Sequence, residues 1–123
     1  MSRSRQQATT LHRYTQRFRE LRQELQQLDF FCKGTVLKRM MKCGRAHCAC
    51  HRDPTKRHGP YFEWTYKAKG TTVNVKLSPQ TAPLYQAAAK QYRQLKTTLH
   101  RLERLSRTAL TYAAKNAQQG RGR

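Results

Sequence analysis

The first part of the chain places an apolar side chain at every third or fourth position. This spacing is typical of one face of an α-helix, and arginines occupy the other faces. The pattern predicts an amphipathic helix over about residues 9–28. The apolar face comprises Leu11, Tyr14, Phe18, Leu21, Leu25 and Leu28.

Three β-rich segments follow, at residues 35–41, 61–66 and 71–77. Residues 67–70 separate the last two segments, and Gly70 suits the positive φ of a hairpin loop. Apolar side chains alternate along both arms of this hairpin, as they do when one face of a sheet is covered. These segments predict a small antiparallel sheet.

The last part of the chain predicts a second, longer helix. Ser78 can cap its N-terminus and Pro79 suits the first helical position, and the segment then continues to about residue 116. Its apolar face repeats at steps of four and three, so this helix could pair with the first one as an antiparallel coil. The repeat comprises Ala88, Tyr92, Leu95, Leu99, Leu102, Ser106, Ala109 and Ala113, with Leu105 and Tyr112 on an adjoining line.

Charge changes the picture, because 26 Lys and Arg face only six Asp and Glu in 123 residues, for a formal net charge of +20. Most cations therefore lack an internal carboxylate, and an external polyanion such as nucleic acid would relieve their repulsion. An anionic membrane is the rival partner. No segment approaches the roughly 20 apolar residues of a spanning helix, and the basic start of the sequence, residues 1–10, has no apolar signal-peptide core. We expect no membrane association and a cytoplasmic location.

Three cysteines stand close together between the first two β-rich segments. In a reducing compartment such clusters favour metal ligands over disulfides. Cys48 and Cys50 can turn both sulfurs toward one ion, and Cys43 can reach the same ion across the turn that follows it. A tetrahedral Zn²⁺ site needs a fourth donor. We favour His58, which would close the loop just before the second β-rich segment; the competing donors are His47, His51 and Cys32.

The sequence thus predicts an α+β fold: an N-terminal helix, a small antiparallel β-sheet with a zinc-knuckle loop, and a long C-terminal helix that forms an antiparallel pair with the first. Residues 9–116 would form a single zinc-stapled domain. Residues 1–8 and 117–123 would be disordered basic ends.

The motif order also resembles a known family. Cys43-Gly44-Arg45, then Cys48 and Cys50, then His58-Gly59-Pro60-Tyr61, followed by an aromatic strand, a glycine turn and a helix, are similar to the bacterial and phage domain of unknown function DUF6788. The resemblance covers roughly residues 34–110. It implies a zinc site, supports His58 as a ligand, and implies a phage or mobile-element setting. It implies no particular activity.

Other interpretations of the cluster are weaker. Buried, inert cysteines are unusual among Lys, Arg, Gly and His. The C-x4-C-x-C spacing differs from the C-x4-C-x2-C of plant-type iron–sulfur proteins. Three thiolates and an imidazole would leave no coordination position for a catalytic water, so we expect no enzyme activity. Catalysis of RNA cleavage by His47 and His51 is an alternative that their spacing does not favour.

Cationic side chains around the predicted loop are candidates for phosphate contacts, and one aromatic residue is a candidate for a base or ribose contact. The nucleic-acid-binding candidates are Lys42, Arg45, Arg52, Lys56, Arg57, Tyr61, Lys67 and Lys69. The alternating rings of Phe62, Trp64 and Tyr66 are expected in the core. For the arginines of the last helix, a solvated face and a phosphate contact are equally good interpretations. These are Arg93, Arg101, Arg104 and Arg107.

Two function classes follow. The first is a small non-enzymatic zinc protein that binds DNA or RNA, as an accessory factor of a phage or mobile element. The alternative is an adaptor that docks a protein partner, such as a recombinase of a mobile element, through its helical pair. In the second case the charge gives only generic attraction to nucleic acid. Apolar faces at helical spacing would also allow a homodimer.

Overall fold

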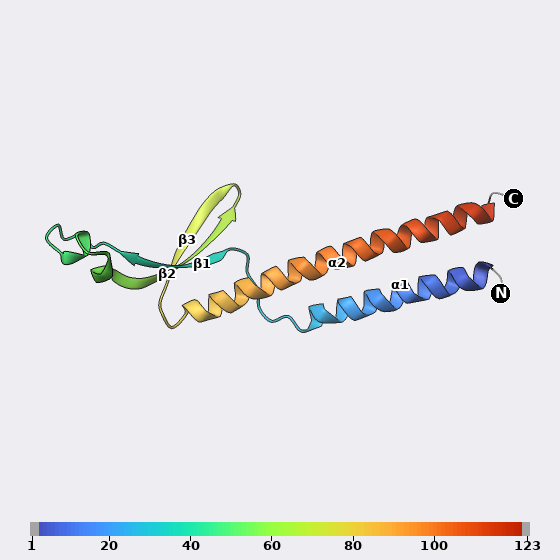
Figure 1. The fold of residues 1–123 in the computed structure, drawn as a ribbon, viewed down its shortest axis with the longest axis horizontal. Coiled ribbons are helices and arrows are strands. Elements are labelled where there is room, and N and C mark those ends of the chain that lie inside the picture. The colour runs from blue at the N-terminus through green and yellow to red at the C-terminus, as the bar shows by residue number, and fades with distance from the viewer. Residues whose placement is uncertain (1–2, 122–123) are drawn as a thin grey trace. The chain divides into compact units, whose positions relative to one another are not determined.

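A computed structural model describes residues 3–121 and contains two helices and a three-stranded antiparallel sheet (Figure 1). The helices are α1 (Arg3–Gln26) and α2 (Ala82–Arg121), and the strands are β1 (Thr35–Met41), β2 (His58–Ala68) and β3 (Thr71–Leu77). The predicted α+β fold is therefore confirmed. No helix in the described part of the chain has a stretch long and apolar enough to cross a membrane.

The chain divides into two compact units. We call the first the helical unit; it contains residues 1–28 and 94–123 of the chain. The second, the sheet unit, contains residues 29–93 and therefore includes the first turns of α2. Each unit carries 13 Lys and Arg against three acids, so the excess of cations is shared equally. The bounds predicted for a single domain, residues 9–116, stay a prediction.

Both helices extend further toward the chain ends than the apolar spacing indicates. α1 begins at Arg3 and α2 continues to Arg121, so most of the ends that were predicted to be disordered are helical. Gln, Arg and Ala are good helix formers, and extending an existing helix costs little compared with starting one. Residues 1–2 and 122–123, which also fall within those predictions, lie outside the described residues.

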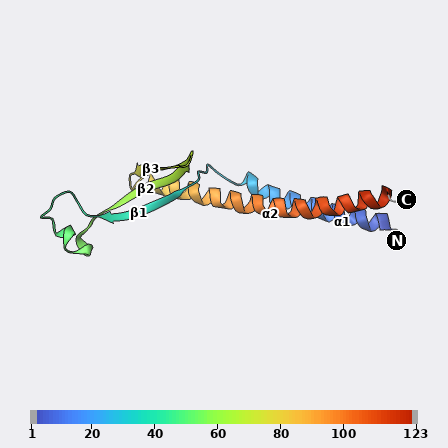
Figure 2. The same cartoon turned by 90° about the horizontal axis from the view of Figure 1, so that it is seen from above.

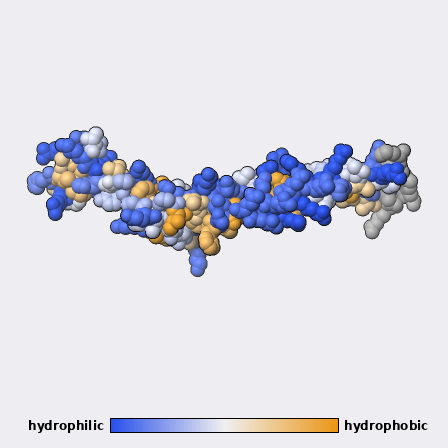
Figure 3. All heavy atoms as spheres, turned by 90° about the horizontal axis from the view of Figure 1, so that it is seen from below, coloured by the Kyte–Doolittle hydropathy of each residue, from blue (hydrophilic) through white to orange (hydrophobic). Residues whose placement is uncertain are grey.

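In the helical unit, α1 and α2 lie side by side and antiparallel, as Figure 1 shows; in Figure 2 they overlap. The rings of Tyr14 and Tyr112 meet edge to face, with centroids 6.0 Å apart. Leu21 and Leu102 are buried between the helices. Figure 3 shows hydrophilic side chains over most of this pair on the face that it displays, with only small apolar patches. The predicted helical pair is thus present, with a narrow core.

One position of the predicted α2 face is wrong. Leu99 is 49% exposed, whereas its neighbour Thr98 is 6% exposed and occupies the inner face. The Thr98 hydroxyl donates a hydrogen bond of 3.2 Å to the carboxylate of Glu24 on α1. The apolar pattern therefore assigns the inner face to Leu99, one position too late, because hydropathy does not reveal a threonine that is buried with a polar partner.

The sheet has the order β1-β2-β3, and its register places apolar side chains on one face. Trp64 at the centre of β2 pairs with Val36 on β1 and Val75 on β3, so these three side chains share a face. The Trp64 ring stacks on Tyr66 at 4.2 Å and lies 5.1 Å from Tyr85 of α2. Trp64 therefore packs against the start of α2 with Tyr66 stacked beside it, as expected for a core, whereas Phe62 is half-buried and lines an open groove.

Two glycines fix the ends of this sheet. Gly70 has φ 78° and follows Lys69 at φ 52°, which are the left-handed conformations of a tight two-residue hairpin. Gly34, at φ 109°, precedes β1. A Cβ atom at Gly34 would lie 2.4 Å from the carbonyl oxygen of Thr65 and 2.8 Å from the Trp64 indole nitrogen. That nitrogen donates to the carbonyl of Lys33 at 2.9 Å, so the chain enters β1 in close contact with β2.

Candidate metal centre and basic groove

The four predicted metal ligands come from the two strand ends and from the short helix between them. Cys43 lies just after β1, and His58 is the first residue of β2, paired in register with Met41. Cys48 caps a short 3-10 helix, Ala49–His51, and Cys50 lies inside that helix. We call residues 43–58 the knuckle. The antiparallel pairing of β1 and β2 brings its two ends together.

The four donor atoms of Cys43, Cys48, Cys50 and His58 all lie within 4.8 Å of one another. The sulfurs of Cys43 and Cys50 are 3.6 Å apart, and the Cys48 sulfur lies 3.3 Å from Nε2 of His58. Around a tetrahedral ion with bonds of roughly 2.3 Å, neighbouring donors are about 3.8 Å apart. The donor set and its spacing therefore fit one tetrahedral metal ion, and these residues could hold it.

The electrostatics of the cluster favour a bound cation. The pKa of the Cys48 thiol is lowered to about 6, first by the backbone N–H of Cys50 and then by the His58 side chain. The backbone N–H of Cys43 acts to lower the pKa of Cys50, but burial and the neighbouring thiols outweigh it and raise that pKa. Cys48 is thus a thiolate at neutral pH, and a metal ion would stabilise the thiolate form of Cys50 as well.

The backbone of the knuckle is ordered by its own hydrogen bonds. The Cys48 N–H donates to the carbonyl of Arg45 at 3.1 Å, and the Asp53 N–H donates to the carbonyl of Ala49 at 2.9 Å. The Asp53 carboxylate accepts from the hydroxyl and from the N–H of Thr55, and these bonds lower the pKa of Asp53. Asp53 therefore caps the second short helix of the loop, Pro54–Lys56.

The competing donors lie outside the cluster or have another partner. Nε2 of His51 is 2.9 Å from the carbonyl oxygen of Cys43, which can only accept, so this nitrogen carries the proton. His51 therefore supports the turn at a ligand, a role that spacing alone did not indicate. His47 is exposed. Cys32 lies before β1, where its N–H donates to Ala88 and burial raises its thiol pKa.

The candidate nucleic-acid residues do not all lie together. Lys42, Arg45, Arg52 and Lys56 are exposed on or beside the knuckle. Arg57 is in the knuckle but half-buried, and its Nε is shielded without a hydrogen-bond partner among the described residues. Lys67 and Lys69 are at the hairpin end of β2, nine or more positions from His58, or roughly 30 Å along the strand at about 3.3 Å per residue. The structure therefore separates these two lysines from the knuckle.

A groove beside the knuckle brings further residues to the site. Its volume is about 750 Å³, and its lining includes Arg39, Lys42, Tyr61, Glu63 and Lys76. Tyr61, also a sequence candidate, is 51% exposed there and is paired in register with Arg39. Arg39 and Lys76 were not among the site residues predicted from the sequence. The strand register could have identified them, because residues paired across antiparallel strands share a face of the sheet.

Comparison with known proteins identifies a family. A family model described as "Domain of unknown function (DUF6788)" matches residues 11–87, which is more than half of the chain, so the chain belongs to this family. The matched span contains the whole sheet and all four cluster residues, and it begins and ends earlier than the resemblance noted in the sequence. No curated protein and no solved structure matches the chain.

Proposed function

We propose that this member of the DUF6788 family is a non-enzymatic zinc protein that binds nucleic acid through its knuckle. One observation carries the proposal: four Cys and His donor atoms lie within 4.8 Å of one another, inside a loop with exposed cations. A metal ion at that point would fix the shape of a phosphate-binding surface.

The donor chemistry supports zinc in a structural role. Three thiolates and one imidazole are a common ligand set of structural Zn²⁺, and they fill its tetrahedral coordination. A catalytic zinc keeps a position for water or substrate, and this donor set provides none. Zinc here would therefore stabilise the knuckle and not act on a substrate.

The charge of the sheet unit supports a polyanionic ligand. Its 13 cations face three acids, and Asp53 is occupied by its cap on Thr55. Cations on a metal-fixed loop lose less conformational entropy on binding phosphate than cations on a free loop. Beside them, the exposed ring of Tyr61 could stack on an unpaired base, and Arg39 and Lys42, which line the same groove, could contact the adjoining phosphates.

The proposal is tested by removing knuckle cations and, separately, an equal number of distant ones. In the triple variant Arg45→Ala, Arg52→Ala, Lys56→Ala, affinity for DNA or RNA should fall. For duplex DNA, the slope of log K against log salt should flatten by up to about 2.7, or about 0.9 for each phosphate that the variant no longer neutralises. The control variant replaces three exposed cations of the helical unit with alanine: Arg13, Arg19 and Lys115. Equal reductions in affinity in both variants would assign binding to net charge and would contradict the proposal.

A second candidate function is docking of a protein partner by the helical pair. Leu110 on α2 is 69% exposed and lies with Tyr14 and Phe18 around an open hollow of about 400 Å³. A second copy of the chain, or a protein of the phage or mobile element implied by the family resemblance, would bury this surface. Sedimentation of the parent and of Leu110→Glu tests the homodimer: a dimer that the substitution dissociates supports it, and a parent monomer at all concentrations contradicts it.

A further inference from the structure

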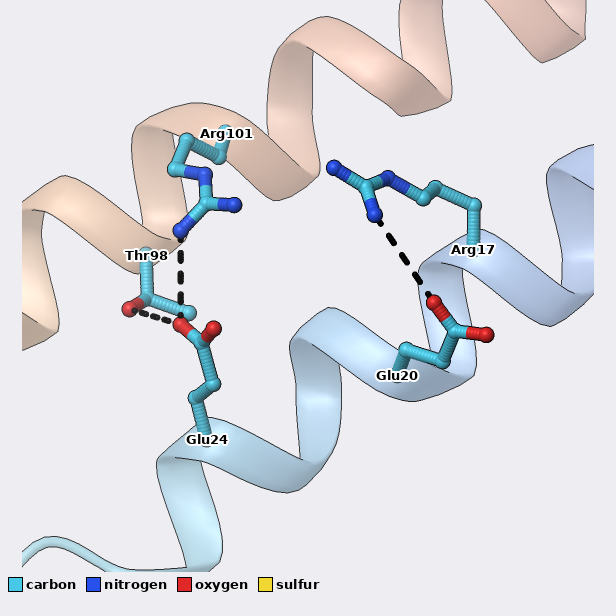
Figure 4. Close-up of polar contacts among 5 residues, drawn as sticks. All are labelled: Arg17, Glu20, Glu24, Thr98 and Arg101. Atoms are coloured by element: carbon cyan, nitrogen blue, oxygen red, sulfur yellow. Dashed lines mark hydrogen bonds and ion pairs between the residues drawn. The ribbon is translucent and has the colours of Figure 1, made fainter.

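The helical unit contains a second concentration of arginines, far along the sequence from the knuckle. A hollow of about 450 Å³ between α1 and α2 is lined by four arginines together with Leu21, Leu105 and Thr108. The arginines are Arg17, Arg101, Arg104 and Arg107. Arg17 extends from α1 and Arg101 from α2 into the space between the two helices (Figure 4).

Three of these arginines form ion pairs with carboxylates, but no carboxylate lines the hollow. Arg17 forms an ion pair with Glu20 at 3.8 Å, and Arg101 forms one with Glu24 at 3.5 Å (Figure 4). The third pair joins Arg107 to Glu103 at 2.6 Å. These are all three acids of the helical unit. Arg104 has no ion pair among the described residues, so the hollow keeps an excess of positive charge.

The four arginines of the hollow are well suited to bind an oxyanion. A guanidinium has five N–H donors, and one contact with a carboxylate leaves the others available. The three ion pairs are exposed, so each is weak and competes little with a phosphate. Arginines that converge from two sides can bind phosphate oxygens bidentately, which a lysine cannot do.

The geometry points to a phosphate-binding site in this hollow, with Arg17 and Arg104 as its central contacts. The ligand is a phosphate oxyanion, either from the backbone of a nucleic acid or from a free oligophosphate. The site lies in the helical unit and uses none of the knuckle residues, so it stands or fails independently of the function proposed above.

The test compares two double variants of the full-length, zinc-loaded protein. Arg17→Ala with Arg104→Ala removes one hollow arginine from each helix. Arg13→Ala with Lys115→Ala also removes one exposed cation from each helix, but neither residue lines the hollow. Binding is measured by anisotropy of a short labelled DNA duplex across a salt series, and by calorimetry with tripolyphosphate.

For at least one probe, we expect the affinity of the hollow variant to be roughly tenfold lower than the affinity of the control variant. With the duplex, its salt slope should flatten by up to about 1.8, as expected when two fewer phosphates are neutralised. Weaker binding of the duplex alone identifies backbone phosphate as the ligand, and weaker binding of tripolyphosphate identifies a free oligophosphate. Equal reductions in the two variants, or a parent protein that binds neither probe, would overturn the inference.

A conservative variant keeps the test informative if the alanine variant is poorly folded by circular dichroism. Arg17→Lys with Arg104→Lys preserves both charges and removes only the planar fork. We expect weaker binding with an unchanged salt slope, and unchanged affinity would contradict the site. If the knuckle triple variant loses binding while the hollow variants do not, the proposed function stands and this inference fails.

Discussion

Losing the metal should loosen the knuckle and leave the helical unit intact. Cys50, at 1% exposed, is the one buried side chain among the described residues of the knuckle, so little apolar packing holds this loop. A metal that joins Cys43 to His58 closes a segment of 15 positions. In the chain-entropy treatment of cross-links, closure of a loop of that length contributes about 3 kcal/mol. Opening of the knuckle should thus become roughly a hundredfold more frequent without metal.

Hydrogen exchange measured by mass spectrometry checks this prediction on zinc-loaded protein, chelated protein and Cys48→Ser. Protection should fall by about a hundredfold after chelation or in the variant at the amides that are bonded within the loop. These are the amides of Cys48, His51, Arg52, Asp53, Lys56 and Arg57. Cys32→Ser is the matched control and should retain protection. The metal account is refuted if the knuckle exchanges equally fast in the zinc-loaded protein and in Cys48→Ser.

Single side chains give three further predictions. In the chelated protein at pH 7, Cys48 should be alkylated much faster than Cys32, because a pKa of about 6 makes Cys48 mostly thiolate whereas burial raises the pKa of Cys32. Zinc should protect Cys48 but not Cys32, and equal alkylation rates read by mass spectrometry would contradict this. Gly34→Ala should destabilise the sheet unit by roughly 2–4 kcal/mol in thermal unfolding, because the new Cβ atom would clash with β2 and the backbone has a positive φ. Gly44→Ala is the control: a Cβ atom there would have no atom within 4 Å, so the unfolding transition should not change. Thr98→Val should lower the stability of the helical unit by about 1 kcal/mol because it removes a hydrogen bond, and an unchanged denaturation midpoint would show that the bond contributes nothing.

The pH dependence of Cys48 has a defined sign. Its folded-state pKa is about 6, below the usual value of a thiol, so the folded protein favours the thiolate. The stability from this preference is fully present above the ordinary thiol pKa and is lost as the pH falls toward 6. In the metal-free protein, knuckle protection should therefore decrease between about pH 9 and pH 6. Protection that rises over this range as the pH falls would contradict the assignment.

The elements that depend on local spacing could be predicted from the sequence. The apolar repeat around Leu21 predicts α1, and the alternation around Trp64 predicts a half-covered strand, because each pattern reports which side of an element is packed. The cysteine spacing likewise predicts the donor cluster, because few other arrangements bring three thiols and a histidine into one loop.

The features that were missed depend on distant partners. Thr98 is buried because it meets Glu24, 74 positions away, and no local pattern reports such a partner. The groove of Arg39 and Lys76 requires the register of three strands, including the shift in pairing between Arg39 and Met41. Lys67 also lies far from the knuckle although only a few positions separate them in the sequence, because β2 between them is an extended strand.

We propose that nucleic acid binds to a cationic knuckle whose shape depends on a bound metal ion. The most direct test of this proposal is the affinity of one protein preparation for single- and double-stranded DNA and RNA at physiological salt, measured with zinc, after chelation, and after zinc is restored. We predict binding to at least one of these forms that falls by roughly tenfold or more on chelation and returns with zinc. Affinity that is the same with and without zinc, or that disappears at physiological salt in both states, would contradict it.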